Sequence, residues 1–265
     1  MGRWRQGAVW VALLGLAAVL GGASEVEWGY QGEVGPAFWG GLDESFALCD
    51  VGQTQSPIDV AFGDVGAGAL PDFALDYAPT PVVLLNNGHA VEVEVQTGSF
   101  LRLDDDLLEL LQFHFHAPSE HTLEGRSFAM ELHLVHLCGR CFFRNEAGAL
   151  AVIGVLIEEG EENAAFARFW DALPGRAGSE VDAGVSLDLY EVLPRDRTAY
   201  RYAGSLTTPP CSEGVTWLLL KQPITLSAEQ IDAFKAVLAG SCCPFNNRPV
   251  QPLNGRQIEV VRDRE

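Results

Sequence analysis

The sequence predicts a mainly β protein with an α+β margin: a single domain around a large, mostly antiparallel, twisted central sheet with short peripheral helices. Three observations carry this prediction. Apolar runs of strand length recur along the chain, turn-forming residues separate many of them, and helical patterns are confined to two short segments. The 265 residues are ample for one large domain with a buried core.

The N-terminal segment has the order of a secretory signal. Basic Arg3 and Arg5 precede an apolar run over 8–20, and small residues follow before the acidic Ser24-Glu25. The alternative is a membrane anchor, but roughly 13 apolar residues fall short of the ~20 that span a bilayer. We expect cleavage after about Ala23, a signal peptide over 1–23 and a catalytic domain over 24–265. The mature protein is then periplasmic or secreted, with no stable membrane span.

The expected strands follow in chain order. They cover 82–85, 90–95, 99–103, 110–116, 130–137, 149–157, 200–206 and 215–220. Turn signals such as Asn87-Gly88, Thr97-Gly98 and Gly125 lie between them. Because such turns join neighbouring strands directly, they favour antiparallel pairing.

Two short helices complete the predicted elements. A mixed apolar face over 162–173 indicates the first, and the capping pattern Ser227-Ala228-Glu229-Gln230 opens the second, which runs to about Leu238. No linker, repeat or low-complexity tract divides the rest of the chain, so a single domain is expected.

The charge balance restricts the partners. Asp and Glu number 36 against 17 Lys and Arg, which gives a formal net charge of −19. Such a surface repels phosphate backbones, and no segment carries a basic stripe. A nucleic-acid partner is therefore not expected.

The histidines carry the chemistry, and all six lie between 89 and 136. His114 and His116 alternate with Phe113 and Phe115, as in a strand whose i and i+2 residues share one face. If 130–137 pairs with this strand, His133 completes a cluster of three imidazoles. Three nitrogen ligands leave one tetrahedral position open, which is typical of a catalytic zinc.

The flanking residues strengthen this interpretation. Histidine pairs on strands are usually satisfied polar residues, and this is the alternative here. Gln112 shares the face of His114, and Glu131 shares that of His133, so both are placed to accept hydrogen bonds from the ring N–H groups.

Several motifs carry a resemblance to a known family. They are Trp28-Gly29-Tyr30, Ser56-Pro57-Ile58, Asn86-Asn87-Gly88-His89, Gln112-Phe113-His114-Phe115-His116, Ser119-Glu120-His121, Glu131-Leu132-His133-Leu134-Val135-His136, Gly204-Ser205-Leu206-Thr207-Thr208-Pro209-Pro210 and Asn246-Asn247-Arg248-Pro249. In this order and spacing the chain resembles the α-class carbonic anhydrases, especially their exported bacterial members.

The resemblance implies a role for each matching residue. His114, His116 and His133 correspond to the ligands of one Zn²⁺ per chain, and Gln112 and Glu131 to their hydrogen-bond partners. Thr207 and Glu120 correspond to the pair that orients the nucleophile, and His89 to the proton shuttle. The remaining matches are Tyr30 and Asn87, which order water for the shuttle, and Val135, Val152, Leu206, Thr208 and Trp217, which line the substrate pocket. His121 and His136 match structural histidines of the core.

The implied activity is reversible hydration of carbon dioxide to bicarbonate and a proton by zinc-bound hydroxide. Weak ester hydrolysis would be a side activity. The main alternative is a non-catalytic binding module on the same fold, although such members lack zinc histidines that this chain keeps. A generic zinc hydrolase is the other alternative, and it would require a carboxylate base beside the metal. Exported relatives are often dimers, so a homodimer is an expectation from the resemblance only.

The six cysteines divide into a pair and a quartet. The resemblance implies a disulfide between Cys49 and Cys211, as in exported family members. Cys138, Cys141, Cys242 and Cys243 lie outside the family pattern. We favour cross-bridging of 138 and 141 to 242 and 243; a second metal site and an intersubunit bridge are the alternatives, and a redox motif is disfavoured because no βαβ unit surrounds the CxxC.

Two residues depart from the family pattern. Glu92 falls on the rim of the implied site, where relatives usually carry a neutral amide, so the shuttle and the approach of anions are expected to differ. Ala117 follows the second histidine of the cluster where animal relatives have tryptophan. Neither departure removes a metal ligand.

Overall fold

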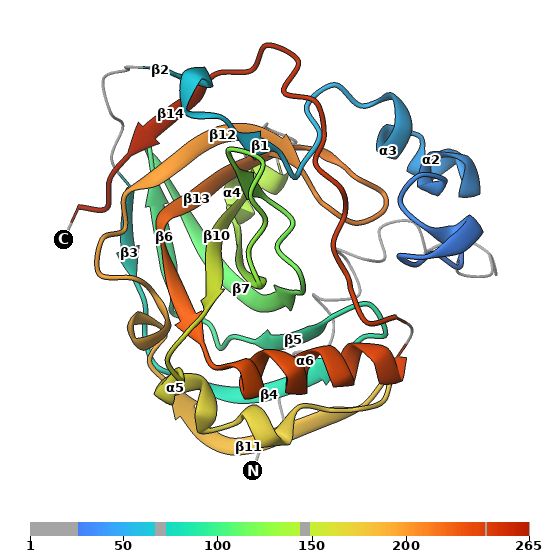
Figure 1. Ribbon diagram of the computed structural model, residues 1–265. Coiled ribbons are helices and arrows are strands. Elements are labelled where there is room, and N and C mark those ends of the chain that lie inside the picture. The colour runs from blue at the N-terminus through green and yellow to red at the C-terminus, as the bar shows by residue number, and fades with distance from the viewer. Residues whose placement is uncertain (1–25, 67–72, 144–148, 242, 265) are drawn as a thin grey trace.

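The computed structural model describes residues 26–66, 73–143, 149–241 and 243–264. The expected signal peptide over 1–23 lies outside them. The described chain forms one large twisted sheet with short helices at its margin (Figure 1), as the strand pattern predicts. Ten strands follow each other in the order β11-β4-β5-β7-β9-β10-β13-β12-β14-β2, and β6 joins β3 to β7.

The main strands are β3 (Phe73–Asp76), β4 (Thr80–Asn86), β5 (Val91–Glu94), β6 (Phe100–Leu103), β7 (Asp106–His116), β9 (Met130–Leu137), β10 (Leu150–Glu159), β11 (Glu180–Leu187), β12 (Ala199–Ser205), β13 (Glu213–Leu226) and β14 (Ile258–Val261). Two-residue strands are β1 (Asp59–Val60), β2 (Val65–Gly66) and β8 (Thr122–Leu123). The helices are α2 (Trp39–Leu42), α3 (Leu48–Val51), α4 (Gly139–Phe143), α5 (Ala164–Ala167) and α6 (Ala228–Ser241). Short 3₁₀ turns occur at Gly32–Val34, Glu44–Phe46, Phe62–Asp64, Trp170–Ala172 and Leu189–Val192.

All eight expected strands are present; their ends agree within four residues, except that β13 continues to Leu226, beyond the expected end at 220. The sequence pattern did not predict β3, β11 or β14. Strand β11 lies at the sheet edge with one face exposed and contains Gly184, which weakens its alternating pattern. The segment expected as one helix over 162–173 is divided into α5 and a 3₁₀ turn. The side chain of Asn163 caps α5 by accepting hydrogen bonds from two backbone N–H groups.

Most strand pairs are antiparallel, but β10 pairs with β13 in parallel. The chain between these two strands contains α5, β11 and β12, which is a crossover long enough for parallel pairing. Strand β10 also pairs with β9, so β9, β10 and β13 lie side by side in the middle of the sheet.

One face of the sheet packs against α5 and α6, which lie on the same side of it (Figure 1). Phe115 of β7 contacts Phe166, Trp170 and Phe234, with ring centroids 5.2–5.7 Å apart. Since successive strand residues point to opposite faces, burying Phe115 against the helices turns His114 and His116 to the other face.

A close approach of strands at Gly204 suggests a stability test. A Cβ at Gly204 would lie 2.2 Å from Ser56 Oγ and 2.7 Å from Trp217 Cδ1, both fully buried. We expect Gly204→Ala to lower the free energy of unfolding by about 2 kcal/mol or more, as in other overpacked cores. Gly41→Ala is the matched control, because nothing lies within 4 Å of its Cβ position. Urea unfolding of both variants measures the difference; equal effects would contradict the packing argument.

The structure forms the disulfide between Cys49 and Cys211 that the resemblance implies. The favoured cross-bridging of the other four cysteines is wrong, because Cys138 and Cys141 pair with each other. They lie at the end of β9 and in α4 with Cα atoms 5.2 Å apart, within disulfide range. Their sulfurs are therefore not available to a second metal. Cys243 is a buried free thiol, and Cys242 lies outside the described residues.

None of the helices in the described ranges has the length and apolar character needed to cross a membrane.

Candidate metal centre

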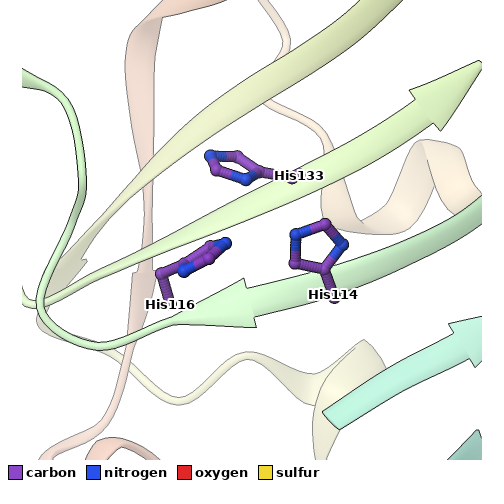
Figure 2. A group of neighbouring side chains, drawn as sticks. All are labelled: His114, His116 and His133. Atoms are coloured by element: carbon purple, nitrogen blue, oxygen red, sulfur yellow. The ribbon is translucent and has the colours of Figure 1, made fainter. Parts of the chain in front are cut away.

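Three histidines converge on the face of the sheet opposite α5 and α6. His114 and His116 come from β7 and His133 from β9, and the strand register places His114 directly opposite His133. Their rings turn toward one another (Figure 2), and one nitrogen from each lies within 4.8 Å of the others. His116 and His133 are buried, and His114 is half-buried. The alternation along two neighbouring strands is sufficient to assemble the cluster.

Each ring uses its other nitrogen in a hydrogen bond pointing away from the cluster. His114 Nδ1 donates to Gln112 Oε1 at 2.8 Å, and His133 Nε2 donates to Glu131 Oε1 at 2.8 Å. His116 Nδ1 donates to the backbone carbonyl of Asn246 at 2.6 Å. These bonds fix the tautomers, so that the inward nitrogens carry lone pairs. The Asn246 carbonyl could not be predicted from the sequence, since a backbone acceptor has no side-chain signature.

The inward nitrogens fit a metal ion. His116 Nε2 is buried and has no hydrogen-bond partner in the part of the chain that the structure describes. A buried nitrogen without a partner costs free energy unless something binds it. Burial lowers the pKa of His116 to about 4 and holds that of His114 well below its usual range, aided by repulsion between the rings. Neutral imidazoles with converging lone pairs are the donor set that Zn²⁺ takes.

Glu131 is the centre of the hydrogen bonding behind the cluster. It is fully buried and accepts bonds from His133, from the His121 ring at 2.7 Å, and from the backbone N–H groups of Glu120 and His121. Burial alone would raise its pKa, but the His121 and His133 rings hold it well below the usual range. The ionised carboxylate therefore increases the basicity of the His133 ring. The hydrogen bonds from the His121 and His133 rings to Glu131 are 2.7–2.8 Å long. They engage the atoms of His121 and Glu131 that could otherwise bind a metal ion.

His121 and His136, the two histidines expected to be structural, each form a hydrogen bond with a tyrosine hydroxyl. His121 Nε2 lies 2.6 Å from Tyr202 Oη, which continues to Ser56 Oγ at 2.9 Å. His136 lies on the opposite face of β9 from His133, with its Nε2 2.7 Å from Tyr77 Oη in the core. Neither His121 nor His136 points its ring into the three-histidine cluster.

Glu120 lies behind the cluster, beside His116. Its Oε1 accepts the backbone N–H of Arg248 at 2.8 Å and is 3.6 Å from His116 Nδ1. Burial raises the pKa of Glu120 to about 7. The His133 ring, the Arg248 N–H and the Thr207 hydroxyl each lower this pKa, but burial has the larger effect. Thr207 is thus near enough to this carboxyl to affect its ionisation, and its own side chain is buried.

An apolar wall borders the histidines. Val152 of β10 lies opposite Val135 on one side and Trp217 on the other, so the three form a row across β9, β10 and β13. The Trp217 ring centroid lies 4.9 Å from that of His133. Leu206 packs against the same group of side chains, and Thr208, half-buried, follows Thr207 in the loop after β12. All five residues expected to line the pocket are therefore near the cluster or in the loop beside it.

His89 lies in the turn between β4 and β5 and stacks on Trp28, with ring centroids 3.7 Å apart and planes at 7°. Burial lowers its pKa. Tyr30 contacts the same tryptophan edge-on at 5.8 Å. Asn87 is exposed, and its Oδ1 accepts the N–H groups of His89 and Ala90, so the side chain shapes the turn. Trp28 was not among the predicted partners of His89.

Glu92 lies directly opposite His114 in the β5–β7 register and is half-buried. Burial, together with repulsion from Glu94, raises its pKa from 4.5 to about 7. This departure from the family pattern therefore places a carboxyl beside one of the three histidines.

The raised pKa of Glu92 predicts a pH-dependent stability of the metal-free protein. Since the folded state binds the proton more tightly, the stabilisation is present below pH 4.5 and is lost as the pH rises through about 7. The glutamine of Glu92→Gln cannot titrate, so the variant does not lose this stabilisation. The free energy of unfolding of the variant minus that of the wild type should therefore increase by about 2 kcal/mol from pH 5 to pH 8.5. Urea unfolding at the two pH values measures this. A difference that does not change with pH would refute the assignment.

The family-model comparison matches residues 34–262 to the eukaryotic-type carbonic anhydrases. A carbonic anhydrase of Pectobacterium atrosepticum is 41% identical over 250 residues, covering 94% of this chain and 97% of the relative. Among solved structures, the α-carbonic anhydrase of Thermovibrio ammonificans in complex with sulfanilamide superposes with a TM-score of 0.82 at 38% identity, covering 89% of this chain and all of that one. Dioscorin in complex with ascorbate has a TM-score of 0.77 at 27% identity, covering 90% and 99%.

Proposed function

The chain belongs to the eukaryotic-type carbonic anhydrase family, and on this premise we propose that it catalyses the reversible hydration of carbon dioxide to bicarbonate and a proton. Members of this family are carbonate dehydratases, which are zinc-dependent lyases. The observation that carries the proposal is the convergence of three neutral imidazole nitrogens beside an apolar wall; one of these nitrogens is buried with no hydrogen-bond partner among the described residues.

His114, His116 and His133 would hold one Zn²⁺ per chain, with Gln112, the Asn246 carbonyl and Glu131 keeping the rings in place. Zinc in such a site makes hydroxide available at neutral pH by lowering the pKa of water, an effect for which carbonic anhydrases are themselves the standard example. Three protein ligands leave the remaining position to the reactants.

Thr207 and Glu120 would orient the nucleophile. We assign the Thr207 hydroxyl as donor to the Glu120 carboxylate, which leaves the hydroxyl oxygen to accept a hydrogen bond from the nucleophile. The Arg248 N–H and the His133 ring favour the ionised form of Glu120 that this assignment requires. The threonine then selects one orientation of the attacking oxygen.

Val135, Val152, Leu206 and Trp217 would hold carbon dioxide. The substrate has no charge and no hydrogen-bond donor, so an apolar surface beside the metal position suits it, while the Thr207 backbone N–H and Thr208 would contact the more polar product. The same nucleophile would hydrolyse esters weakly, because the space beside the apolar wall is too small for large esters.

His89 would carry the proton to solvent. Imidazole titrates near neutral pH, and burial lowers the pKa of this ring, which favours release of the proton. His89 lies in the turn between β4 and β5 and stacks on Trp28, and water ordered by Tyr30 and Asn87 would connect it to the three-histidine cluster.

The remaining proposals concern location and assembly. The basic, apolar and small-residue order over 1–23, together with two disulfides, supports export with a catalytic domain over 24–265, and hence a periplasmic or secreted protein. We propose a homodimer only because exported bacterial relatives are often dimers. Carbon dioxide and bicarbonate are the partners, and nucleic acid is disfavoured by the net charge of −19.

A non-catalytic binding module is the second candidate function, since dioscorin with ascorbate shares this fold. Stopped-flow hydration of carbon dioxide by the purified mature protein, with metal analysis of the same sample, distinguishes the two. We expect fast hydration with about one zinc per chain, lost on chelation and restored by added zinc. Bound zinc without hydration would overturn the proposed activity and favour the binding module.

A further inference from the structure

A basic hollow lies far along the sheet from the three histidines, at the start of β12 and the end of β14. The β12–β14 register places Ala199 opposite Val261, so residues 195–198 and 262–264 continue side by side beyond the paired strands. Residues of these two segments line an open hollow of about 440 Å³, and Figure 1 shows the segment that follows β14 leading to the C-terminal end of the chain. We call it the arginine pocket; it is lined by Arg195, Asp196, Arg197, Thr198, Arg262 and Asp263.

The pocket concentrates positive charge on an acidic protein. It contains three of the 17 basic residues of a chain with a net charge of −19. Lys221 lies alongside, because its backbone N–H donates to the Thr198 carbonyl at 2.8 Å. No single segment of the sequence has a basic stripe; Arg262 joins Arg195 and Arg197 because the β12 and β14 strands pair at this end.

The two acids of the pocket leave part of this charge available. Asp263 pairs with Arg197, and Asp196 accepts hydrogen bonds from the N–H and hydroxyl of Thr198. None of the ion pairs formed between described residues includes Arg195 or Arg262, and both are exposed. The pKa of Asp196 is lowered by the Thr198 bonds first and then by Lys221 and Arg262, which indicates a positive potential there.

We propose that the arginine pocket binds a phosphate-type oxyanion, independently of the proposed carbonic anhydrase activity. A guanidinium presents parallel N–H donors that match two oxygens of a phosphate, and such charge-assisted bonds are stronger than neutral ones. Arg195 and Arg262 supply the donors from two chain segments. The hollow is large enough for a phosphate group carried by a larger molecule as well as for the free anion.

The test is calorimetric titration of the zinc-loaded protein with inorganic phosphate at constant ionic strength. We expect saturable binding with a Kd below about 1 mM, weakened about tenfold or more in Arg195→Gln/Arg262→Gln because both guanidiniums are lost. The matched control is Arg102→Gln/Arg176→Gln, which removes the same charge from exposed arginines outside the pocket. Anion binding at the metal centre would be the same in all three proteins, so a difference in phosphate affinity between them measures binding at the arginine pocket.

A second arm identifies the source of the phosphate. Vesicles containing phosphatidic acid are sedimented with the same three proteins. Phosphate binding without vesicle binding supports a free oxyanion, and binding of both with the same dependence on Arg195 and Arg262 supports a headgroup. The proposal is overturned if the wild type shows no saturable phosphate binding, even if it binds vesicles, or if the two double variants weaken binding equally, which would indicate bulk charge alone.

Discussion

Replacing His133 with alanine is expected to remove both bound zinc and carbon dioxide hydration. Losing a group that only hydrogen-bonds a metal ligand typically costs about 10–100-fold in metal affinity or activity. Loss of one of three ligands should therefore cost more, about 10³-fold or greater in kcat/KM. His133 also donates to Glu131, so the variant leaves that buried carboxylate with one partner fewer. Stopped-flow hydration and metal analysis of the same samples measure both effects.

His136→Gln is the control for this variant. Both histidines are buried on β9, but His136 faces the core and bonds Tyr77 on the side away from the cluster. Its replacement should lower stability while leaving zinc content and kcat/KM within about twofold of the wild type, as expected for a site that is not perturbed. Circular dichroism checks that both variants fold. A folded His133→Ala protein that still hydrates carbon dioxide rapidly would remove this histidine from the metal centre.

Removing the long disulfide should have the largest effect on stability. Cys49 and Cys211 are 162 residues apart, and the chain-entropy model gives about 5 kcal/mol for a loop of that length. We expect Cys49→Ser/Cys211→Ser to lower the free energy of unfolding by roughly that amount. Activity should fall as well, because Cys211 donates its backbone N–H to the Thr208 carbonyl and so anchors the loop that carries Thr207.

Cys138→Ser/Cys141→Ser is the matched comparison. Its cysteines are three residues apart, for which the same model gives only about 1.5 kcal/mol. Urea unfolding of both double variants under non-reducing conditions gives the two free energies. Serine at both positions of a pair prevents exchange with the free thiol of Cys243. Equal losses in the two variants would show that loop length does not govern the stabilisation here.

The arrangement of the metal centre could be predicted from the sequence because a strand has a period of two. Alternation alone places His114 and His116 on one face and Phe115 on the other, and the same rule applies to His133 on the neighbouring strand. Gln112 and Glu131 follow from the same rule, since each is two residues from the histidine that it contacts. The face of each strand is thus a local signal, and the pairing of β7 with β9 brings the two histidine faces together.

Other features depend on contacts between segments far apart in the chain. The Asn246 carbonyl reaches His116 across 130 residues, and Trp28 stacks on His89 from the N-terminal segment. Neither contact leaves a periodic trace in the sequence. The pairing of Cys138 with Cys141 was predicted wrongly because it depends on where the chain turns after β9, and spacing alone does not determine that turn.

The sequence by itself therefore determined the strands, the face on which the histidines lie and the family resemblance, since each rests on residues close together or on motifs in order. The tertiary structure alone decided the backbone acceptor of His116, the partner of Cys138 and the gathering of Arg195 and Arg262 in one pocket. These arise where strand ends and loops meet. Their positions follow from the packing of the whole sheet, because hydrogen-bond geometry and charge act through distance in space, whatever the separation along the chain.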